Sequence, residues 1–311
     1  MQVERRRIVV LGTGGTIAGR AASARDNIGY RAAEVGVADL LAGLPAMDGI
    51  ELQAEQVAQI DSKDMDFGTW CALARRCAHW LADDGVAGIV VTHGTDTLEE
   101  TAFFLQSVLA PAKPVVLTGA MRPATSAAAD GPQNLADALA VAAAPGACGV
   151  VVAFAGAVHG AADVQKVHSY RTDAFASGDA GPIAYVEEGA LRLLRAWPQG
   201  GLLRGVAALA APEAWPRVEI VLNHAGADGA IVRALVQDGV QGLVLAGTGN
   251  GTVHHALEAA LLAAQASGVA VRRASRCAQG RVLPRAGDRL RAAEGLTPVK
   301  ARVALLLELM R

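Results

Sequence analysis

The chain alternates short apolar runs with longer amphipathic stretches, and this pattern predicts strands and helices in turn. Four runs of Ile, Val and Leu are typical of strands buried on both faces. Between them, residues 66–82 and 97–109 place apolar side chains on one face at helical spacing. Strands that alternate with helices form βαβ units, so the sequence predicts an α/β protein with parallel sheets. The four runs are Ile8–Leu11, Gly88–Thr92, Pro114–Thr118 and Gly149–Phe154.

The same alternation resumes near the C-terminus after a less regular stretch. Residues 155–179 are loop-like, and the pattern loosens further between Tyr185 and Pro216. We therefore predict a larger N-terminal domain at 1–193, a linker at 194–212 and a smaller C-terminal domain at 213–311. Residues 302–309 are compatible with a strand or a helix. In the second domain the predicted strands are 219–222, 242–246 and 269–272, and the predicted helices are 227–238 and 252–267.

Composition narrows the function classes. The 311 residues carry a formal charge of −2, which argues against nucleic acid as a partner. Each apolar run is too short to span a membrane. The four cysteines form no C-x-x-C motif, which indicates free thiols in a reducing compartment. Residues 1–7 contain no apolar signal region, so we expect a cytoplasmic protein, or a periplasmic one if a signal has been removed.

Polar residues gather just past the predicted strands, at 12–16, 61–64, 92–97 and 118–126. These segments hold threonines, glycines and carboxylates. Because the carboxyl ends of parallel strands share one edge of a sheet, that edge is the expected ligand site. The glycines around Thr13 permit positive φ angles and expose backbone N–H groups that can bind an anion or an oxyanion.

Several common chemistries do not fit these segments. A dinucleotide motif that begins at Gly12 would need glycine at position 17, where the chain has Ile17. Neither a P-loop nor a G-x-S-x-G nucleophile motif occurs. His254 and His255 are adjacent, which is a poor spacing for two metal ligands. We therefore predict neither a cofactor nor a metal.

A threonine hydroxyl needs a base and oxyanion donors before it can act as a nucleophile. Lys166 could be that base with Asp96 orienting it, although a solvated loop lysine and a second helix-capping residue are the ordinary alternatives. Tyr30 lies in a polar, Gly-flanked segment at 19–36. It is either a surface aromatic or part of a lid that brings its phenol to Thr13. Thr97 and Glu100 have the spacing of a capping box.

Two longer motifs resemble the signatures of bacterial-type L-asparaginases, in their type II branch. They are Thr13-Gly-Gly-Thr-Ile-Ala-Gly19 and Thr92-His-Gly-Thr-Asp-Thr-Leu-Glu-Glu-Thr101. The segments 113–123, 130–132 and 247–251 also fit, and the resemblance covers nearly the whole chain. It implies a two-domain α/β fold and hydrolysis of L-asparagine to L-aspartate and ammonia, with a side activity on L-glutamine.

The resemblance also implies individual roles. Thr13 matches the nucleophile that forms an acyl-enzyme, with Tyr30 as its loop partner. Thr95, Asp96 and Lys166 match a second catalytic triad. The substrate-binding positions are Ser62, Lys63, Gly94, Thr95 and Asp96. The family forms a homotetramer of two intimate dimers with its sites at the intimate dimer interface, and Thr252 matches a position that reaches the neighbouring subunit's site.

The chain departs from the family pattern at three places. Lys63 replaces a Gln or Glu, Thr252 replaces an Asn or Ser, and residues 277–293 lack the Glu that supports the first triad in many members. Two alternatives to an asparaginase stay open, and the altered loop at 277–293 favours only the second. One is the amidase subunit of a tRNA-dependent amidotransferase. The other is a non-catalytic protein of the same fold that binds aspartate or asparagine.

Overall fold

The computed structural model describes residues 6–45 and 47–311 and divides into two units, one ending at Ala207 and the other running from Ala208 to Arg311. The predicted linker at 194–212 spans this boundary. The large N-terminal and smaller C-terminal α/β units match the predicted fold class.

The first unit is built on an eight-stranded sheet with the strand order β10-β9-β6-β5-β4-β3-β1-β2. Its part from β2 to β5 is parallel, as predicted. The remaining strands join through antiparallel pairs. The strands are β1 (Arg6–Gly14), β2 (Ile50–Ile60), β3 (Val86–Thr92), β4 (Pro114–Thr118), β5 (Gly149–Phe154), β6 (Ala157–Gly160), β9 (Ala184–Glu187) and β10 (Ala190–Leu193).

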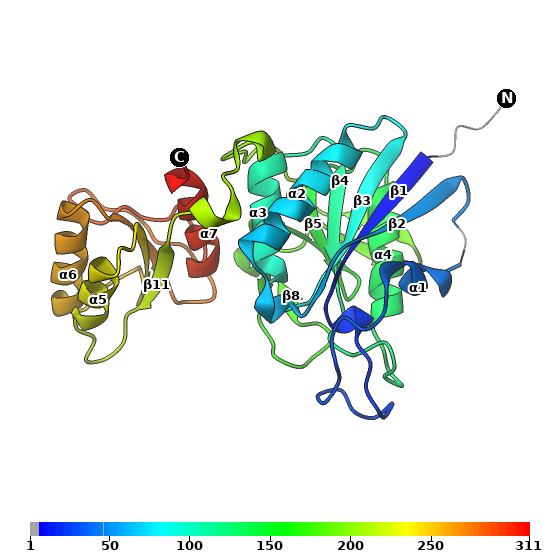
Figure 1. Cartoon of the computed structure of the whole chain (residues 1–311), viewed down its shortest axis with the longest axis horizontal. Helices are drawn as coiled ribbons and strands as arrows, with labels where there is room; N and C mark the ends of the chain where they lie inside the picture. The colour runs from blue at the N-terminus through cyan, green and yellow to red at the C-terminus, as the bar shows by residue number, and fades with distance from the viewer. Residues whose placement is uncertain (1–5, 46) are drawn as a thin grey trace. The chain divides into compact units, whose positions relative to one another are not determined.

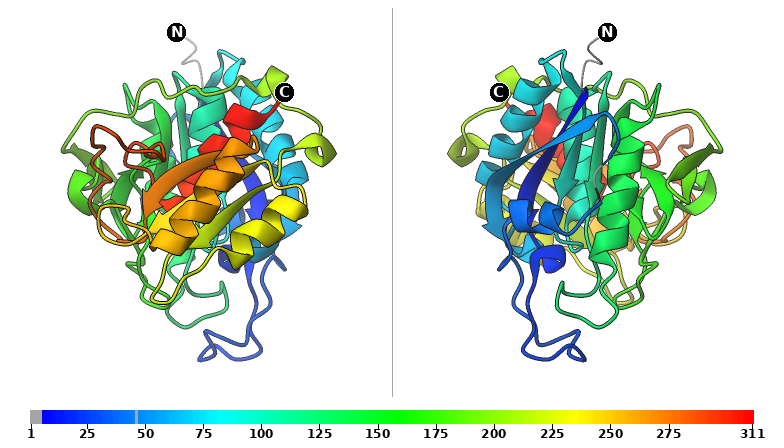
Figure 2. Two further views of the ribbon diagram at one scale, coloured as in Figure 1. Left: turned by 90° about the vertical axis from the view of Figure 1, so that its left-hand side faces the viewer. Right: turned by 90° about the vertical axis from the view of Figure 1, so that its right-hand side faces the viewer.

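Helices cover both faces of this sheet, which explains why its central strands are apolar throughout. Helices α2 (Phe67–Leu81) and α3 (Leu98–Leu109) lie on one face, while α1 (Val37–Ala42) and α4 (Gly131–Ala143) lie on the other (Figures 1 and 2). Every residue of β3, β4 and β5 is buried. Alternate residues of each strand therefore enter different cores, and Val10, Val90 and Val116 pack with Leu135 and Leu139 of α4.

The antiparallel part of the sheet corrects two sequence interpretations. The stretch 155–179, expected to be loop-like, contains β6 and a separate two-stranded hairpin of β7 (Gln165–Lys166) and β8 (Phe175–Ala176). The loosened pattern from Tyr185 onward contains most of β9 and the edge strand β10. These strands are two to four residues long, which is too short for an alternating pattern to stand out.

The second unit is a three-stranded parallel sheet in the order β11-β12-β13. Helices α5 and α6 lie side by side on one face and α7 covers the other (Figure 2). The segment that the sequence left open as strand or helix belongs to α7. The elements are β11 (Val218–Leu222), α5 (Ala230–Gln237), β12 (Gly242–Gly247), α6 (His255–Ala266), β13 (Ala270–Ser275) and α7 (Pro298–Leu309).

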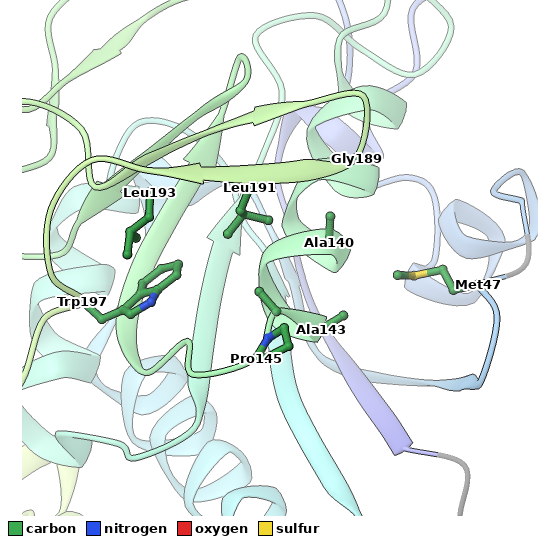
Figure 3. Close-up of a pocket in the computed structure, with 9 residues that line it drawn as sticks. Met47, Ala140, Ala143, Pro145, Gly189, Leu191, Leu193 and Trp197 are labelled. Atoms are coloured by element: carbon green, nitrogen blue, oxygen red, sulfur yellow. The ribbon is translucent and has the colours of Figure 1, made fainter. Parts of the chain in front are cut away.

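An open apolar cavity of about 480 Å³ lies between the C-terminal half of α4 and the β9–β10 hairpin (Figure 3). Met47, Leu191 and Trp197 contribute to its wall. None of its lining residues is titratable, and none belongs to the site predicted from the sequence. Among the described residues, no helix has the length and apolar character needed to cross a membrane.

Candidate active site

The predicted site lies where the strand order changes direction. From β1 the chain continues to β2 on one side, whereas β3 pairs with β1 on the other side. The turns that leave β1 and β3 therefore diverge, and such a point in a parallel sheet opens a crevice for ligands. Gly12 is in register with Thr92, so Thr13 and the turn that begins at His93 are neighbours. The buried Thr13 hydroxyl donates to the carbonyl oxygen of Thr92 at 2.9 Å.

Three segments approach one another closely because glycines stand at their contacts. A Cβ atom on Gly15 would lie 2.3 Å from the Cα of Gly94, and one on Gly94 would lie 2.5 Å from the Oγ of Ser62. Gly15 also has a φ of 82°, in the region that favours glycine. The absence of side chains at these two positions brings the turn after β1, the turn after β3 and the buried Ser62 together.

Ser62 is bonded to the turn that holds Thr95 and Asp96. Its hydroxyl accepts the backbone N–H of Asp96 at 3.2 Å, and its carbonyl oxygen accepts the hydroxyl of Thr97 at 2.8 Å. The second bond corrects the capping-box prediction, because Thr97 stands at the N-cap position of α3 but makes no side-chain cap. The Thr97 hydroxyl thus orients its proton toward Ser62, and its oxygen accepts no N–H from the start of α3.

Lys166 joins Thr95 and Asp96 through its side chain. Its Nζ lies 2.8 Å from the Oγ1 of Thr95 and 2.6 Å from the Oδ1 of Asp96. The lysine side chain is 18% exposed, whereas that of Asp96 is 55% exposed, so the carboxylate stands at the solvent side of the group. An amine, a hydroxyl and a carboxylate in this arrangement can exchange a proton with a reacting amide.

The position of Lys166 depends on the short β7–β8 hairpin. Its backbone N–H donates to the Oε1 of Glu99 in the first turn of α3 at 3.1 Å, and it pairs with Phe175 across the hairpin. Glu99 was not identified from the sequence as part of the site. It lies within the second motif, but nothing in that motif indicates a contact with a residue 67 positions later.

Tyr30 is tied to a different threonine from the one expected. Its phenol and the Oγ1 of the buried Thr16 lie 2.6 Å apart, while the hydrogen bond of Thr13 goes to Thr92. The residues from Arg20 to Arg31 are largely exposed and project from the unit (Figure 1). The structure thus brings Tyr30 to the first motif through Thr16.

The turn after β4 forms a further wall that the sequence did not define. A Cβ on Gly119 would lie 3.5 Å from the methyl group of Thr95. Asp130 stands at the N-cap position of α4, but its carboxylate accepts the backbone N–H groups of Met121 and Arg122 rather than capping the helix. Asn134 donates to the carbonyl oxygen of Gly119 at 3.0 Å. Asp130 and Asn134 therefore fix this turn beside Thr95.

Two of the predicted site residues, Lys63 and Thr252, have polar groups that already bind other groups of the protein. Lys63 forms ion pairs with Asp61 and Asp64, and the hydrogen bond to Asp64, followed by that to Asp61, raises the pKa of its ammonium group. Thr252 lies in the second unit, where it is exposed and its hydroxyl donates to the carbonyl oxygen of Thr248 at 2.9 Å. Neither contact links these residues to Thr95 or Lys166.

Two family models match the chain, one for each structural unit. The family described as "Asparaginase, N-terminal" matches residues 7–199, and "Glutaminase/Asparaginase C-terminal domain" matches residues 217–311. The chain belongs to the asparaginase family. Both asparaginase regions are thus present, in the order of the two structural units.

Individual asparaginases match along almost the entire chain. The "Glutaminase-asparaginase" of Pseudomonas fluorescens biotype A is 36% identical, with 98% of this chain and 86% of the relative covered. "L-asparaginase 2" of Bacillus subtilis is 37% identical, with 98% and 82% covered. The crystal structure of the "Probable Cytoplasmic L-asparaginase" from Campylobacter jejuni superposes with a TM-score of 0.92 at 37% identity, covering 98% of this chain and 95% of that chain.

Proposed function

We propose that this chain is an amidohydrolase that converts L-asparagine to L-aspartate and ammonia, with a side activity on L-glutamine. The relatives named L-asparaginase and glutaminase-asparaginase support both substrates. The observation that carries the proposal is the contact of the Lys166 amine with Thr95 and Asp96 in the crevice beside β1.

In the proposed first step, the Oγ of Thr13 attacks the side-chain amide carbon of asparagine. A C–O bond forms, the C–N bond breaks, and the proton of the threonine hydroxyl leaves on ammonia. The product is an aspartyl ester of Thr13. Water then cleaves the ester, which releases aspartate and restores the hydroxyl, so no oxidant, reductant or cofactor enters the balance.

Thr95, Asp96 and Lys166 would move the protons of these steps. The amine at 2.8 Å from the Thr95 hydroxyl can exchange a proton with it, and Asp96 holds the amine in place. Tyr30, held against Thr16, would close the opposite side of the substrate and assist Thr13 through the first motif.

Substrate recognition is assigned to the turns that surround this group. The Ser62 hydroxyl and the backbone at Gly94 would bind the α-carboxylate, and Asp96 would bind the α-ammonium group. The Asp96 side chain is 55% exposed, so its carboxylate can contact an incoming ammonium group without a rearrangement of the protein. Lys63 stands beside Ser62 and would contact the substrate only by exchanging one of its ion pairs with Asp61 and Asp64.

The oligomeric state and the cellular location are also proposed from the family resemblance. We expect a homotetramer, a dimer of dimers with sites at the intimate interface, in which Thr252 of one subunit would face the site of another. The relatives differ in location, since one is named periplasmic in Haemophilus influenzae and another cytoplasmic in Campylobacter jejuni. Cytoplasmic location therefore stays a proposal for this chain.

The function is tested by ammonia release from L-asparagine and L-glutamine with Thr13→Ala and Thr95→Ala variants. Each variant should lose about 10³-fold or more of kcat, because a missing nucleophile or proton-transfer group removes a chemical step. Ser107→Ala is the matched control, since it removes a buried hydroxyl that donates to the carbonyl oxygen of Phe103, one turn earlier in the same helix. Full activity in a Thr13→Ala, Thr95→Ala double variant would refute the proposal.

The same preparation separates the two alternatives. A protein that only binds amino acids would show aspartate binding by calorimetry with no ammonia released by the wild-type chain. An amidotransferase subunit would release ammonia only after addition of partner proteins and tRNA. Acid-quenched reaction with L-asparagine should trap an aspartyl group on the peptide that contains Thr13, which neither alternative predicts.

A further inference from the structure

We infer that His93 is a positioning residue for the proposed reaction: a relay of hydrogen bonds from Trp70 through Thr101 and His93 fixes the Gly94–Thr95 peptide. This inference depends on the proposed function only for its kinetic consequence. The relay joins α2, α3 and the turn after β3, and its members are all buried.

The bonds of the relay are short and continuous. The Nε1 of Trp70 lies 2.9 Å from the Oγ1 of Thr101, which lies 3.0 Å from the Nε2 of His93. The Nδ1 of His93 lies 2.7 Å from the carbonyl oxygen of Gly94. Trp70 is itself anchored, since its ring stacks on Phe104 with centroids 4.8 Å apart.

Only one direction of donation satisfies this relay. An indole N–H can only donate, and a carbonyl oxygen can only accept. The Nδ1 of His93 must therefore carry the proton that it shares with Gly94. In a neutral imidazole the Nε2 is then an acceptor, so the hydroxyl of Thr101 donates to it and accepts from Trp70. Both ends of the relay lead to the same tautomer, with the proton on Nδ1.

The protonation state agrees with this geometry. His93 is fully buried, and this burial lowers the pKa of its imidazole from 6.5 to about 4. The ring is neutral at neutral pH and has one donor and one acceptor, as the relay requires. A doubly protonated ring would place an N–H against the proton of Thr101 or force that hydroxyl to turn.

The relay ends at Gly94, a residue type whose backbone torsions are the least restricted. Gly94 has no side chain to restrict its torsions, and none would fit, because Ser62 occupies the space. The Gly94 carbonyl belongs to the same peptide plane as the N–H of Thr95. A bond from His93 to this carbonyl therefore fixes where the Thr95 backbone, and with it the hydroxyl beside Lys166, stands.

The test compares Thr101→Val, which removes both hydrogen-bonding functions at nearly constant shape, with Thr101→Ser, which keeps the hydroxyl. We expect kcat for L-asparagine to fall about tenfold or more in Thr101→Val with a smaller change in KM, because a displaced catalytic hydroxyl affects the chemical step. Thr101→Ser should restore most of kcat. Ser107→Ala, a buried hydroxyl on the same helix, should leave kcat unchanged.

A spectroscopic measurement decides the relay independently of activity. The ¹⁵N NMR spectrum of histidine-labelled wild-type protein, assigned with His93→Gln, should show His93 as the Nδ1–H tautomer at pH 7, and Thr101→Val should change its Nε2 shift. An Nε2–H tautomer in the wild type, or a folded Thr101→Val variant with wild-type kcat, would overturn the inference. The wild-type spectrum decides even where Thr101→Val fails to fold. Failure of the proposed function would be different, since the wild type would then release no ammonia.

Discussion

The Nζ of Lys166 stands 2.8 Å from the Oγ1 of Thr95, although 71 positions separate the two residues. Replacing the amine by the apolar side chain in Lys166→Met should lower kcat about 10²–10⁴-fold, because the proposed proton transfer loses its base. Steady-state ammonia assays measure this effect. Lys113→Met is the control, since that lysine donates to the carbonyl oxygen of Asp83, away from Thr95 and Asp96. Equal loss in both variants would point to general destabilisation instead of proton transfer.

The pairing of Tyr30 with Thr16 predicts coupled effects on catalysis. Tyr30→Phe and Thr16→Val each break the same 2.6 Å hydrogen bond, so kcat/KM in the double variant should be no lower than in the worse single variant. A double-mutant cycle on kcat/KM checks this. Independent, multiplying losses would mean that Tyr30 acts on Thr13 without the help of Thr16.

The close contact of Gly15 with Gly94 predicts a strong effect of one added methyl group. Gly15→Ala combines a positive φ with a Cβ that meets backbone atoms at 2.3 Å, so we expect destabilisation of about 3 kcal/mol or more and loss of activity. Gly146→Ala is the matched control. Gly146 has a φ of 75° and open space around its Cβ position, so only the conformational term of about 1–2 kcal/mol applies.

Chemical denaturation measures both free energies of unfolding. A Gly15→Ala variant as stable as Gly146→Ala would contradict the close approach of the two turns.

The buried His93 predicts a loss of stability in acid. Its pKa is lowered to about 4 in the folded chain, against 6.5 when unfolded. As the pH falls from 6.5 to 4, the unfolded chain binds a proton here that the folded chain refuses. The free energy of unfolding should therefore fall by roughly 3 kcal/mol across this window, and the contribution is complete above pH 6.5.

Urea denaturation at several pH values checks this prediction. The slope of the free energy of unfolding against pH reports the number of protons taken up on unfolding. In His93→Gln this number should be smaller by about one between pH 4 and 6.5, because glutamine does not titrate. An unchanged slope would mean that His93 is protonated inside the fold.

The alternating pattern of apolar residues was sufficient for the parallel half of the first unit and for the whole second sheet. Runs such as Ile8–Leu11 are long enough to identify a strand covered on both faces. The antiparallel strands were missed because β7 and β8 hold two residues each. Their pairing depends on distant neighbours, and no local periodicity records it.

The candidate site, like the fold, contains features that the sequence predicts and others that depend on distant contacts. Glycines and hydroxyls at strand ends pointed to the segments 12–16, 61–64 and 92–97, because parallel topology brings such ends together, whereas the roles of Ser62 and Thr95 came from the family resemblance. Hydroxyl partners could not be predicted in this way. The Thr97 hydroxyl donates to Ser62 and does not cap α3, since its orientation is set by a residue distant in the sequence. The directed relay through His93 likewise needs α2 and α3 in place before it exists.

The hairpin that carries Lys166 has a consequence for how the enzyme could be divided. The amine proposed for catalysis comes from outside the parallel strands, on a two-residue strand that pairs with another of two residues. A chain cut between β5 and β6 would leave a fragment with both threonines but without the amine. Adding the second fragment, which carries Lys166, should then restore hydrolysis. Each fragment could be fused to one of two proteins, so that ammonia release reports their binding to each other.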